Sequence, residues 1–154
     1  LTPAQMESQH GRLWESDKIE DLNRYDAIRK VEPMQRMLGE LRATAWISGL
    51  RAEQTEYRQL LPRVALDGGL YRVYPILEWS SRQIYSFMRR YGLPDHPLFQ
   101  RGYATVGDSH SSRPMAAEDV HERSTRFSGK KQECGLHLPM QASPVGTEQI
   151  PAMS

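Results

Sequence analysis

The chain has 154 residues, which is enough for one domain with a hydrophobic core and too few for two. Its formal net charge is +1, so the overall charge favours neither nucleic acid nor an anionic membrane as a partner, and any anion site must be local. The single cysteine excludes a disulfide within the chain, and it excludes a zinc or iron–sulfur site held by the cysteines of one chain.

The hydropathy pattern bears on where the protein resides. No apolar run approaches the roughly 20 residues that span a bilayer, and the N-terminus lacks the apolar core of a signal peptide. We therefore expect a soluble protein in the reducing environment of the cytoplasm. The first residue is Leu1 rather than methionine, so we also expect further residues upstream.

Residues 1–24 are polar with a few apolar positions at near-helical spacing, which predicts a surface helix or lid. The next segment contains KVEPM, in which Pro33 fits the first turn of a helix with one apolar face. Arg29 and Lys30 would precede the N-terminus of that helix, where exposed amides and the helix dipole favour an anion. The two cations predict a phosphate or sulfate site, and two solvated charges are the alternative.

The run TAWISGLR, residues 44–51, has the composition of a β-strand and predicts a buried central strand with Arg51 at its C-terminal edge. Ligands of open α/β sheets bind at that edge. Because a guanidinium can donate to two oxygens of a phosphate or sulfonate, we expect Arg51 to bind an anion.

Residues 62–77 contain two alternating apolar runs around Asp67, Gly68 and Gly69, which predicts a β-hairpin. A helix is predicted within residues 80–92, with an apolar face that we expect to pack into the core rather than to stack on nucleic acid bases. That face consists of Ile84, Phe87, Met88 and Tyr91.

Residues 93–114 form a long irregular segment with repeated proline and glycine, and loops of this length are often functional. The segment presents four hydrogen-bond donors to an anion, although a solvated turn would look the same: His110, Ser111, Ser112 and Arg113. Asp108 and His110 lack a second pair of ligands at metal spacing, so we expect no metal site.

The cysteine lies in RFSGKKQECGLH, residues 126–137, where Cys134 is accompanied by cations and a histidine: Arg126, Lys130, Lys131 and His137. Nearby cations favour a thiolate, the nucleophilic form of a thiol, so the segment predicts a reactive thiol. An inert buried cysteine is the alternative. Residues 115–125, which precede this segment, predict an exposed linker or short helix. Residues 138–154, which follow it, have three prolines and no periodicity and predict a disordered tail.

Four strings together resemble the assimilatory phosphoadenylyl-sulfate (PAPS) reductases, thioredoxin-dependent enzymes of sulfate assimilation. ECGLH is similar to their catalytic C-terminal signature, KVEPM to an active-site segment, GLRAEQTEYR to GLRREQS, and GYATVGDSHSSR to GYLSVGDTHTT. The resemblance implies the C-terminal half of an α/β fold, an adenine-nucleotide α-hydrolase-like open sheet with flanking helices. It covers roughly residues 11–137. We expect a helical lid segment at residues 1–24 and a reductase-like catalytic part at residues 25–137.

The resemblance also implies roles for individual residues. Cys134 would be the nucleophile that attacks the sulfur of PAPS, and His137 would orient the thiol or donate a proton near it, a merely structural role being equally open. The residues implied to bind the substrate are Lys30, Arg51, His110, Arg113, Arg126 and Lys131. Ala52 replaces the second arginine of the GLRREQS string, and Arg58 is a candidate to supply the lost contact.

The related adenylyl-sulfate (APS) reductases carry cluster-binding cysteines where this chain has Tyr25 and Asp26 and again at residues 108–111. All four are absent, which implies no iron–sulfur cluster, no other tightly bound cofactor, and the 3′-phosphorylated substrate. Because a second cysteine is lacking, an external dithiol, thioredoxin or glutaredoxin, would release sulfite. A homodimer is implied as well.

One half of the family domain has no counterpart in this chain. No GxGxxG, P-loop or SGG-type loop occurs in the sequence, so the nucleotide-binding half is not recognisable. A non-catalytic fragment or pseudoenzyme is therefore an alternative to a reductase. An ATP-dependent adenylyltransferase is a weaker one, since adenylyl transfer has no use for ECGLH.

Overall fold

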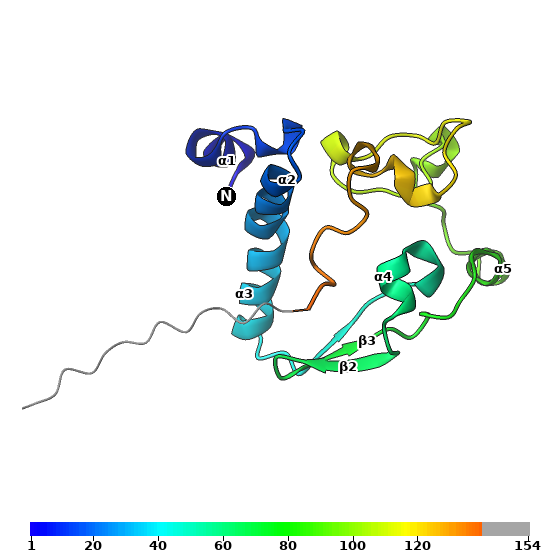
Figure 1. Ribbon diagram of the computed structural model, residues 1–154. Coiled ribbons are helices and arrows are strands. Elements are labelled where there is room, and N and C mark those ends of the chain that lie inside the picture. Colours follow the sequence, from blue (N-terminus) through cyan, green and yellow to red (C-terminus); the bar gives the residue numbers. More distant parts are fainter. Residues whose placement is uncertain (140–154) are drawn as a thin grey trace, which may run out of the picture.

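The computed structural model describes residues 1–139 and has the mixed α/β composition that the sequence predicts (Figure 1). The α-helices and strands are α1 (Pro3–His10), α2 (Ile19–Asp26), α3 (Glu32–Glu40), β1 (Ala45–Ile47), α4 (Glu56–Gln59), β2 (Val64–Asp67), β3 (Leu70–Val73) and α5 (Ser81–Arg90). Short 3₁₀ turns occur at Leu13–Glu15, Ala52–Gln54, Phe99–Arg101, Ser109–Ser111, Glu122–Thr125 and Phe127–Gly129. None of the helices within residues 1–139 is long and apolar enough to cross a membrane.

Helices α2 and α3 form one continuous rod through a π-helical stretch at Ala27–Val31. The expected helix N-terminus at Pro33 is therefore wrong: Arg29 and Lys30 lie inside the rod, where no free amide groups are available to an anion. The wider π turn just precedes the proline, which cannot donate a backbone hydrogen bond. The expected boundary between residues 24 and 25 falls within α2, so the structure shows no division there.

In the described part of the chain the sheet has three strands in the order β1-β3-β2, with β1 parallel to β3 and β2 antiparallel to it. Gly68 and Gly69 both have positive φ, at 58° and 83°, as the tight turn of a hairpin requires, and the predicted hairpin is confirmed. The expectation of a buried central strand is wrong, because within residues 1–139 β1 lies at the edge of the sheet and Ile47 is 68% exposed.

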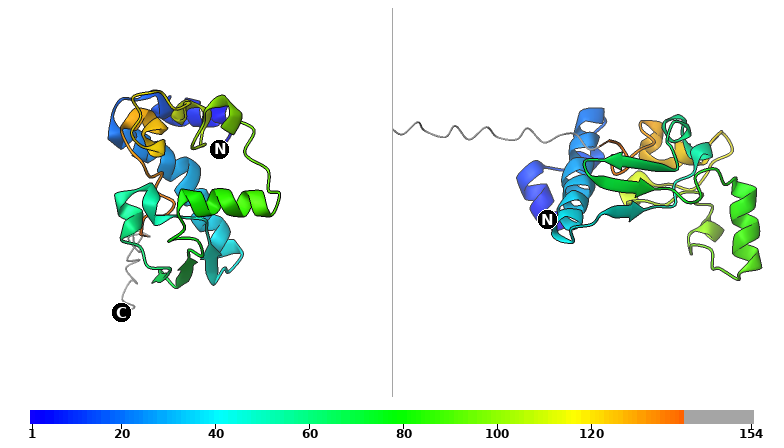
Figure 2. Two further views of the ribbon diagram at one scale, coloured as in Figure 1. Left: turned by 90° about the vertical axis from the view of Figure 1, so that its right-hand side faces the viewer. Right: turned by 90° about the horizontal axis from the view of Figure 1, so that it is seen from below.

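Helix α5 confirms the helix predicted within residues 80–92, and its start follows from Ser80, whose hydroxyl accepts from the Gln83 amide in a capping box. Its apolar face, however, does not enter the core. No residue of α5 is buried, and Phe87 and Tyr91 are 40% and 57% exposed. Figure 2 shows α5 at the periphery, on the opposite side of the molecule from the α2–α3 rod.

A small apolar core lies beside the sheet, where Leu50, Tyr74 and Leu77 pack together. The C-terminal segment then passes between the α2–α3 rod and α4, drawn in orange in Figure 1. This path brings the cysteine-bearing segment close to both the rod and the sheet. The disordered tail predicted for residues 138–154 lies outside the described residues, except for Leu138 and Pro139.

Candidate active site

The ring of Phe127 gathers three of the cations that the sequence singled out. Lys30 Nζ lies 5.4 Å, Lys131 Nζ 5.1 Å and Arg126 Cζ 5.2 Å from the ring centroid, distances at which a cation is attracted to an aromatic ring. Phe127 is buried, and both it and Ser128 have positive φ, 48° and 53°. Such strained backbone at non-glycine residues is concentrated at functional sites. Phe127 lies in the string quoted around Cys134, but the sequence assigned it no role.

The buried carboxylate of Asp26 joins two of these cations. Lys30 Nζ lies 2.7 Å from its Oδ1, and Lys131 Nζ lies 2.7 Å from its Oδ2. Lys30 also contacts Asp108 Oδ2 at 2.7 Å. Burial acts to lower the pKa of Lys30, but the hydrogen bonds and charges of Asp108 and Asp26 outweigh it and raise the pKa above its ordinary value. The spacing of Asp26 and Lys30, one helical turn, was the only sequence signal for this pairing.

His110 lies at the edge of the same cluster. Its ring packs edge-on against Tyr25 at 5.0 Å between centroids, and its Nε2 lies 3.9 Å from Asp108 Oδ2. Burial lowers the pKa of His110, an effect that the negative charge of Asp108 opposes and the positive charge of Lys30 reinforces. The structure thus places His110 beside the cluster as a neutral ring at pH 7.

Arg126 is held by the loop at residues 107–112. Its Nη1 donates to Ser112 Oγ at 3.1 Å, and its side chain is almost fully buried. A Cβ added to Gly107 would lie 1.7 Å from the Arg126 Nη1, so only glycine leaves room for the guanidinium. Gly107 therefore has a packing role that the sequence analysis missed.

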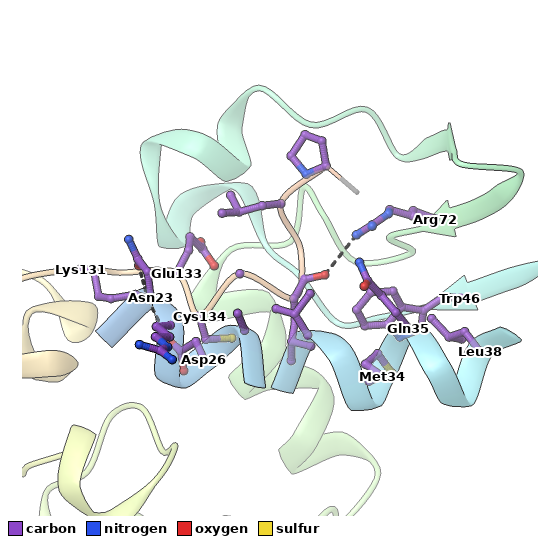
Figure 3. Close-up of a pocket in the computed structure, with 17 residues that line it drawn as sticks. Asn23, Asp26, Met34, Gln35, Leu38, Trp46, Arg72, Lys131, Glu133 and Cys134 are labelled. Atoms are coloured by element: carbon purple, nitrogen blue, oxygen red, sulfur yellow. Dashed lines mark hydrogen bonds and ion pairs between the residues drawn. The ribbon is translucent and has the colours of Figure 1, made fainter. Parts of the chain in front are cut away.

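Cys134 lines a pocket of about 650 Å³ between the α2–α3 rod and the sheet. Figure 3 shows Cys134 near Asp26 and Lys131 at one end of the pocket, with Trp46 and Arg72 at the other end. Among the lining residues are also the apolar side chains of Met34 and Leu38. The thiol thus shares a cavity with part of the cation cluster.

The residues next to Cys134 have partners on the sheet side of the molecule. Glu133 is bound by Arg58 through two contacts, so the expectation that Arg58 replaces a lost anion contact is not supported: its guanidinium already binds a carboxylate. The His137 ring stacks on the Trp46 ring, with 4.9 Å between the ring centroids and an angle of 20° between the ring planes. Burial, reinforced by the charge of Arg58, lowers the pKa of His137 to about 4. His137 is consequently neutral at pH 7.

Two of the expected substrate-binding arginines are not part of the cluster around Phe127. Arg51 pairs with Glu53 and donates to Ser81 Oγ at 3.0 Å. Arg113 pairs with Asp119, with 2.6 Å between Nη2 and Oδ1. Each of these arginines thus has a carboxylate partner close to it in the sequence.

The charges of the cluster are nearly balanced. Lys30, Lys131 and Arg126 carry three positive charges, and Asp26 and Asp108 carry two negative ones, which leaves one positive charge. Because these groups are partly withdrawn from water, that charge acts more strongly on an incoming anion than it would at the surface. The arrangement can attract an anion to a thiol.

Comparison with known proteins gives consistent matches. The family model described as phosphoadenosine phosphosulfate reductase domain matches residues 1–114. Proteins named phosphoadenosine 5′-phosphosulfate reductase are similar to this chain: that of Synechocystis sp. is 57% identical over 140 residues, covering 91% of this chain and 56% of the relative. The protein of Synechococcus sp. is 59% identical, and the match covers 90% of this chain and 60% of that relative. The protein of Shewanella oneidensis is 44% identical, and the match covers 89% of this chain and 55% of that relative. The chain therefore spans somewhat more than half the length of these relatives.

Proposed function

The chain belongs to the phosphoadenosine phosphosulfate reductase family, and we propose that it forms the thiol-bearing part of an enzyme that reduces PAPS to sulfite and adenosine 3′,5′-bisphosphate. The family assignment confirms the expected fold class, an adenine-nucleotide α-hydrolase-like α/β fold. The observation that carries the proposal is the shared pocket of Cys134, Lys131 and Asp26, through which the thiol adjoins the cation cluster.

In the proposed first step the Cys134 thiolate attacks the sulfur of the sulfonucleotide. A sulfur–sulfur bond forms, the bond from that sulfur to the phosphate oxygen breaks, and the phosphate leaves with the electron pair. Lys30, Lys131 and Arg126 would stabilise the charge that develops on the leaving phosphate. His110, Arg51 and Arg113 remain proposed contacts for the rest of the nucleotide. The product on the protein is S-sulfocysteine.

The second step needs a reductant, which we propose to be thioredoxin or glutaredoxin. One thiolate of the external dithiol attacks the Cys134 sulfur, sulfite leaves, and a mixed disulfide forms. The second thiol of the dithiol then releases Cys134 as a thiol and leaves the reductant oxidised. The single cysteine of the chain is consistent with an external source of both electrons. A reducing cytoplasm would keep the thiol available, and we propose a homodimer by analogy with the family.

The decisive experiment follows transfer of the sulfonyl group. Two proteins are compared: the chain itself, and a longer protein in which the chain is joined to the N-terminal part of one of its relatives. Each is incubated with ³⁵S-labelled PAPS without a reductant, and label on the peptide that contains residue 134 is measured by mass spectrometry and radioactivity. We expect label that thioredoxin releases as sulfite, and none in the Cys134→Ser variant. Label on the longer protein alone would mean that the chain needs the remaining part of the domain.

Two outcomes would replace the proposal by its alternatives. If neither protein is labelled although both are folded and bind adenosine 3′,5′-bisphosphate, the chain belongs to a non-catalytic relative. If ATP is consumed in the absence of PAPS, an adenylyltransferase is the better assignment.

A further inference from the structure

We propose that Arg58, Trp46 and Arg72 are positioning residues that hold Cys134 in its pocket by anchoring both ends of the segment formed by residues 133–137. The segment adjoins the rod on one side and the sheet on the other, as Figure 3 shows for Cys134 and Arg72. The inference rests on the proposed function only for its catalytic consequence, because the anchoring itself is a property of the folded chain.

The first anchor lies immediately before the cysteine. Arg58 Nε lies 2.7 Å from Glu133 Oε1, and Arg58 Nη2 lies 2.9 Å from Oε2, so the two planar groups meet in a forked arrangement. Thr55 Oγ1 donates to Oε1 at 2.9 Å. Both charged side chains are largely buried, at 6% and 12% exposed. Two parallel hydrogen bonds fix the orientation of the carboxylate as well as its distance from the guanidinium, and they therefore orient the backbone at residue 133.

The charge state of Glu133 supports a stable anchor. Burial acts to raise the pKa of Glu133, but the hydrogen bond and the charge of Arg58 outweigh it and hold the pKa below its ordinary value. Glu133 is consequently ionised at pH 7, and the ion pair is complete.

The second anchor follows the cysteine by two residues. Trp46 on β1 and Arg72 on β3 are register partners, so their side chains emerge on the same face of the sheet. Arg72 Nη1 donates to the Leu136 carbonyl oxygen at 3.2 Å, and the His137 ring stacks on Trp46. The guanidinium of Arg72 itself lies 5.5 Å from the Trp46 ring centroid. Trp46 and Arg72 thus form a surface on the sheet to which residues 136 and 137 bind.

Tyr57 adds one more contact to this end of the segment, since its hydroxyl donates to the His137 carbonyl oxygen at 3.0 Å. Tyr57 lies on α4 beside Arg58, so α4 contacts both ends of the segment. The cysteine has little freedom to move while both anchors hold, because only Cys134 and Gly135 lie between them.

Gly135 explains how the segment passes the rod. Its φ is +88°, and an added Cβ would lie 3.1 Å from Val31 Cγ2. The backbone is therefore pressed close to the rod at the residue after the cysteine. Holding a nucleophile at one position before the substrate arrives removes part of the entropic barrier to attack.

The anchors are polar contacts and one ring stack rather than a large apolar interface. Such contacts are few and local, so the segment can leave its place without unfolding the domain. Release would expose the Cys134 sulfur, which is half-buried when docked. The external dithiol requires such exposure to reach the S-sulfonated cysteine.

Thiol labelling tests the anchoring without any substrate. The chain contains one cysteine, so the rate of its alkylation by iodoacetamide reports on residue 134 alone. Rates are measured from pH 6 to 10: the midpoint of the profile reports ionisation of the thiol, and the plateau reports access to it. We expect Trp46→Ala and Arg58→Lys each to raise the plateau about tenfold, since loss of about 1.4 kcal/mol of docking energy corresponds to that factor.

Matched controls come from the same chain. Trp79→Ala removes a tryptophan that packs against Phe87 near α5, and Arg63→Lys alters an arginine in an exposed pair with Glu78. Neither change should alter the plateau. Trp46→Phe keeps an aromatic surface for His137 and should restore slow labelling. Circular dichroism and melting curves establish that each variant is folded.

Turnover in the longer protein then tests the positioning role. Trp46→Ala should lower kcat about tenfold with little change in KM, and Trp46→Phe should recover most of it. An unchanged labelling plateau in folded Trp46→Ala and Arg58→Lys variants would overturn the anchoring. That result does not depend on whether the wild-type chain is labelled by PAPS. A raised plateau with unchanged kcat would overturn the positioning role, and this second readout rests on the proposed function.

Discussion

Lys30 Nζ lies 2.7 Å from Asp26 Oδ1, one helical turn away along the α2–α3 rod, and the Asp26 side chain is only 2% exposed. The second oxygen of the same carboxylate binds Lys131, which comes from the cysteine-bearing segment. One buried charge therefore ties the rod to the segment that carries the thiol. It also holds both lysines in place while partly neutralising them.

Replacing Asp26 by asparagine should destabilise the fold. The change keeps the shape but removes the shared counter-ion of two largely buried ammonium groups, although Lys30 keeps its contact with Asp108. Breaking a buried pair in this way costs about 3 kcal/mol. Urea unfolding measures the loss. Asp17→Asn is the matched control, because the pair of Asp17 with Lys130 is exposed and should contribute nothing measurable. Equal stability of the two variants would contradict the role assigned to Asp26.

Lys131 and Lys130 are adjacent in the sequence, yet the structure predicts different effects of replacing them. Lys131→Met should lower kcat/KM for PAPS in the longer protein about 10² fold, because a buried cation beside the thiol is lost. Lys130→Met should change it less than about twofold, because Lys130 pairs with an exposed carboxylate. Steady-state sulfite release measures both, and similar losses would argue against the cation cluster as the anion site.

Gly107→Ala should displace the Arg126 guanidinium, since the new methyl group would overlap it. We expect a stability loss of about 1–3 kcal/mol from overpacking and a reduced affinity for adenosine 3′,5′-bisphosphate in the longer protein. Gly39→Ala, which meets nothing within 4 Å in α3, should instead be neutral or slightly stabilising. Unfolding curves and calorimetric titration measure the two effects. A combined Gly107→Ala, Arg126→Ala variant should lose less than the sum of both changes.

Docking of the segment should weaken in mild acid. His137 has a pKa of about 4 when stacked on Trp46, against about 6.5 for an exposed imidazole. Its depressed pKa stabilises the docked state above pH 6.5, and this contribution is lost as the pH falls from 6.5 to 4, because only the released imidazole takes up a proton. The charged groups that act on the ring are Arg58, Glu133, Arg72 and Arg123.

The measurement is the rate at which Cys134 reacts with a pyridyl disulfide, a reagent that remains active in acid. We expect this rate to rise as the pH falls from 6.5 to 4, relative to a short unstructured peptide of the same sequence. His137→Phe keeps a ring on Trp46 but cannot be protonated, so its relative rate should stay constant. A wild-type rate that also stays constant would show that His137 does not control docking.

Several features followed from the sequence because their causes are local. The hairpin depends on two adjacent glycines that adopt positive φ, and α5 begins where the Ser80 side chain can cap it. The string around Cys134 identified the thiol and nearby cations without any structure. These features involve residues within a few positions of one another, so short-range sterics and hydrogen bonds determine them.

Other features depended on contacts between distant segments, which no local pattern encodes. Lys30 lies inside the rod rather than just before a helix N-terminus, and Asp26 pairs with Lys131 and not with its neighbour Lys130. Arg58 binds Glu133, which lies 75 positions further along the chain. Burial likewise depends on what packs against an element. The apolar strand β1 therefore lies at the edge of the sheet, and the apolar face of α5 remains exposed. The sequence by itself determined which groups are available for the proposed chemistry. Only the tertiary structure decided which of them meet, because ion pairing and desolvation depend on distance in space.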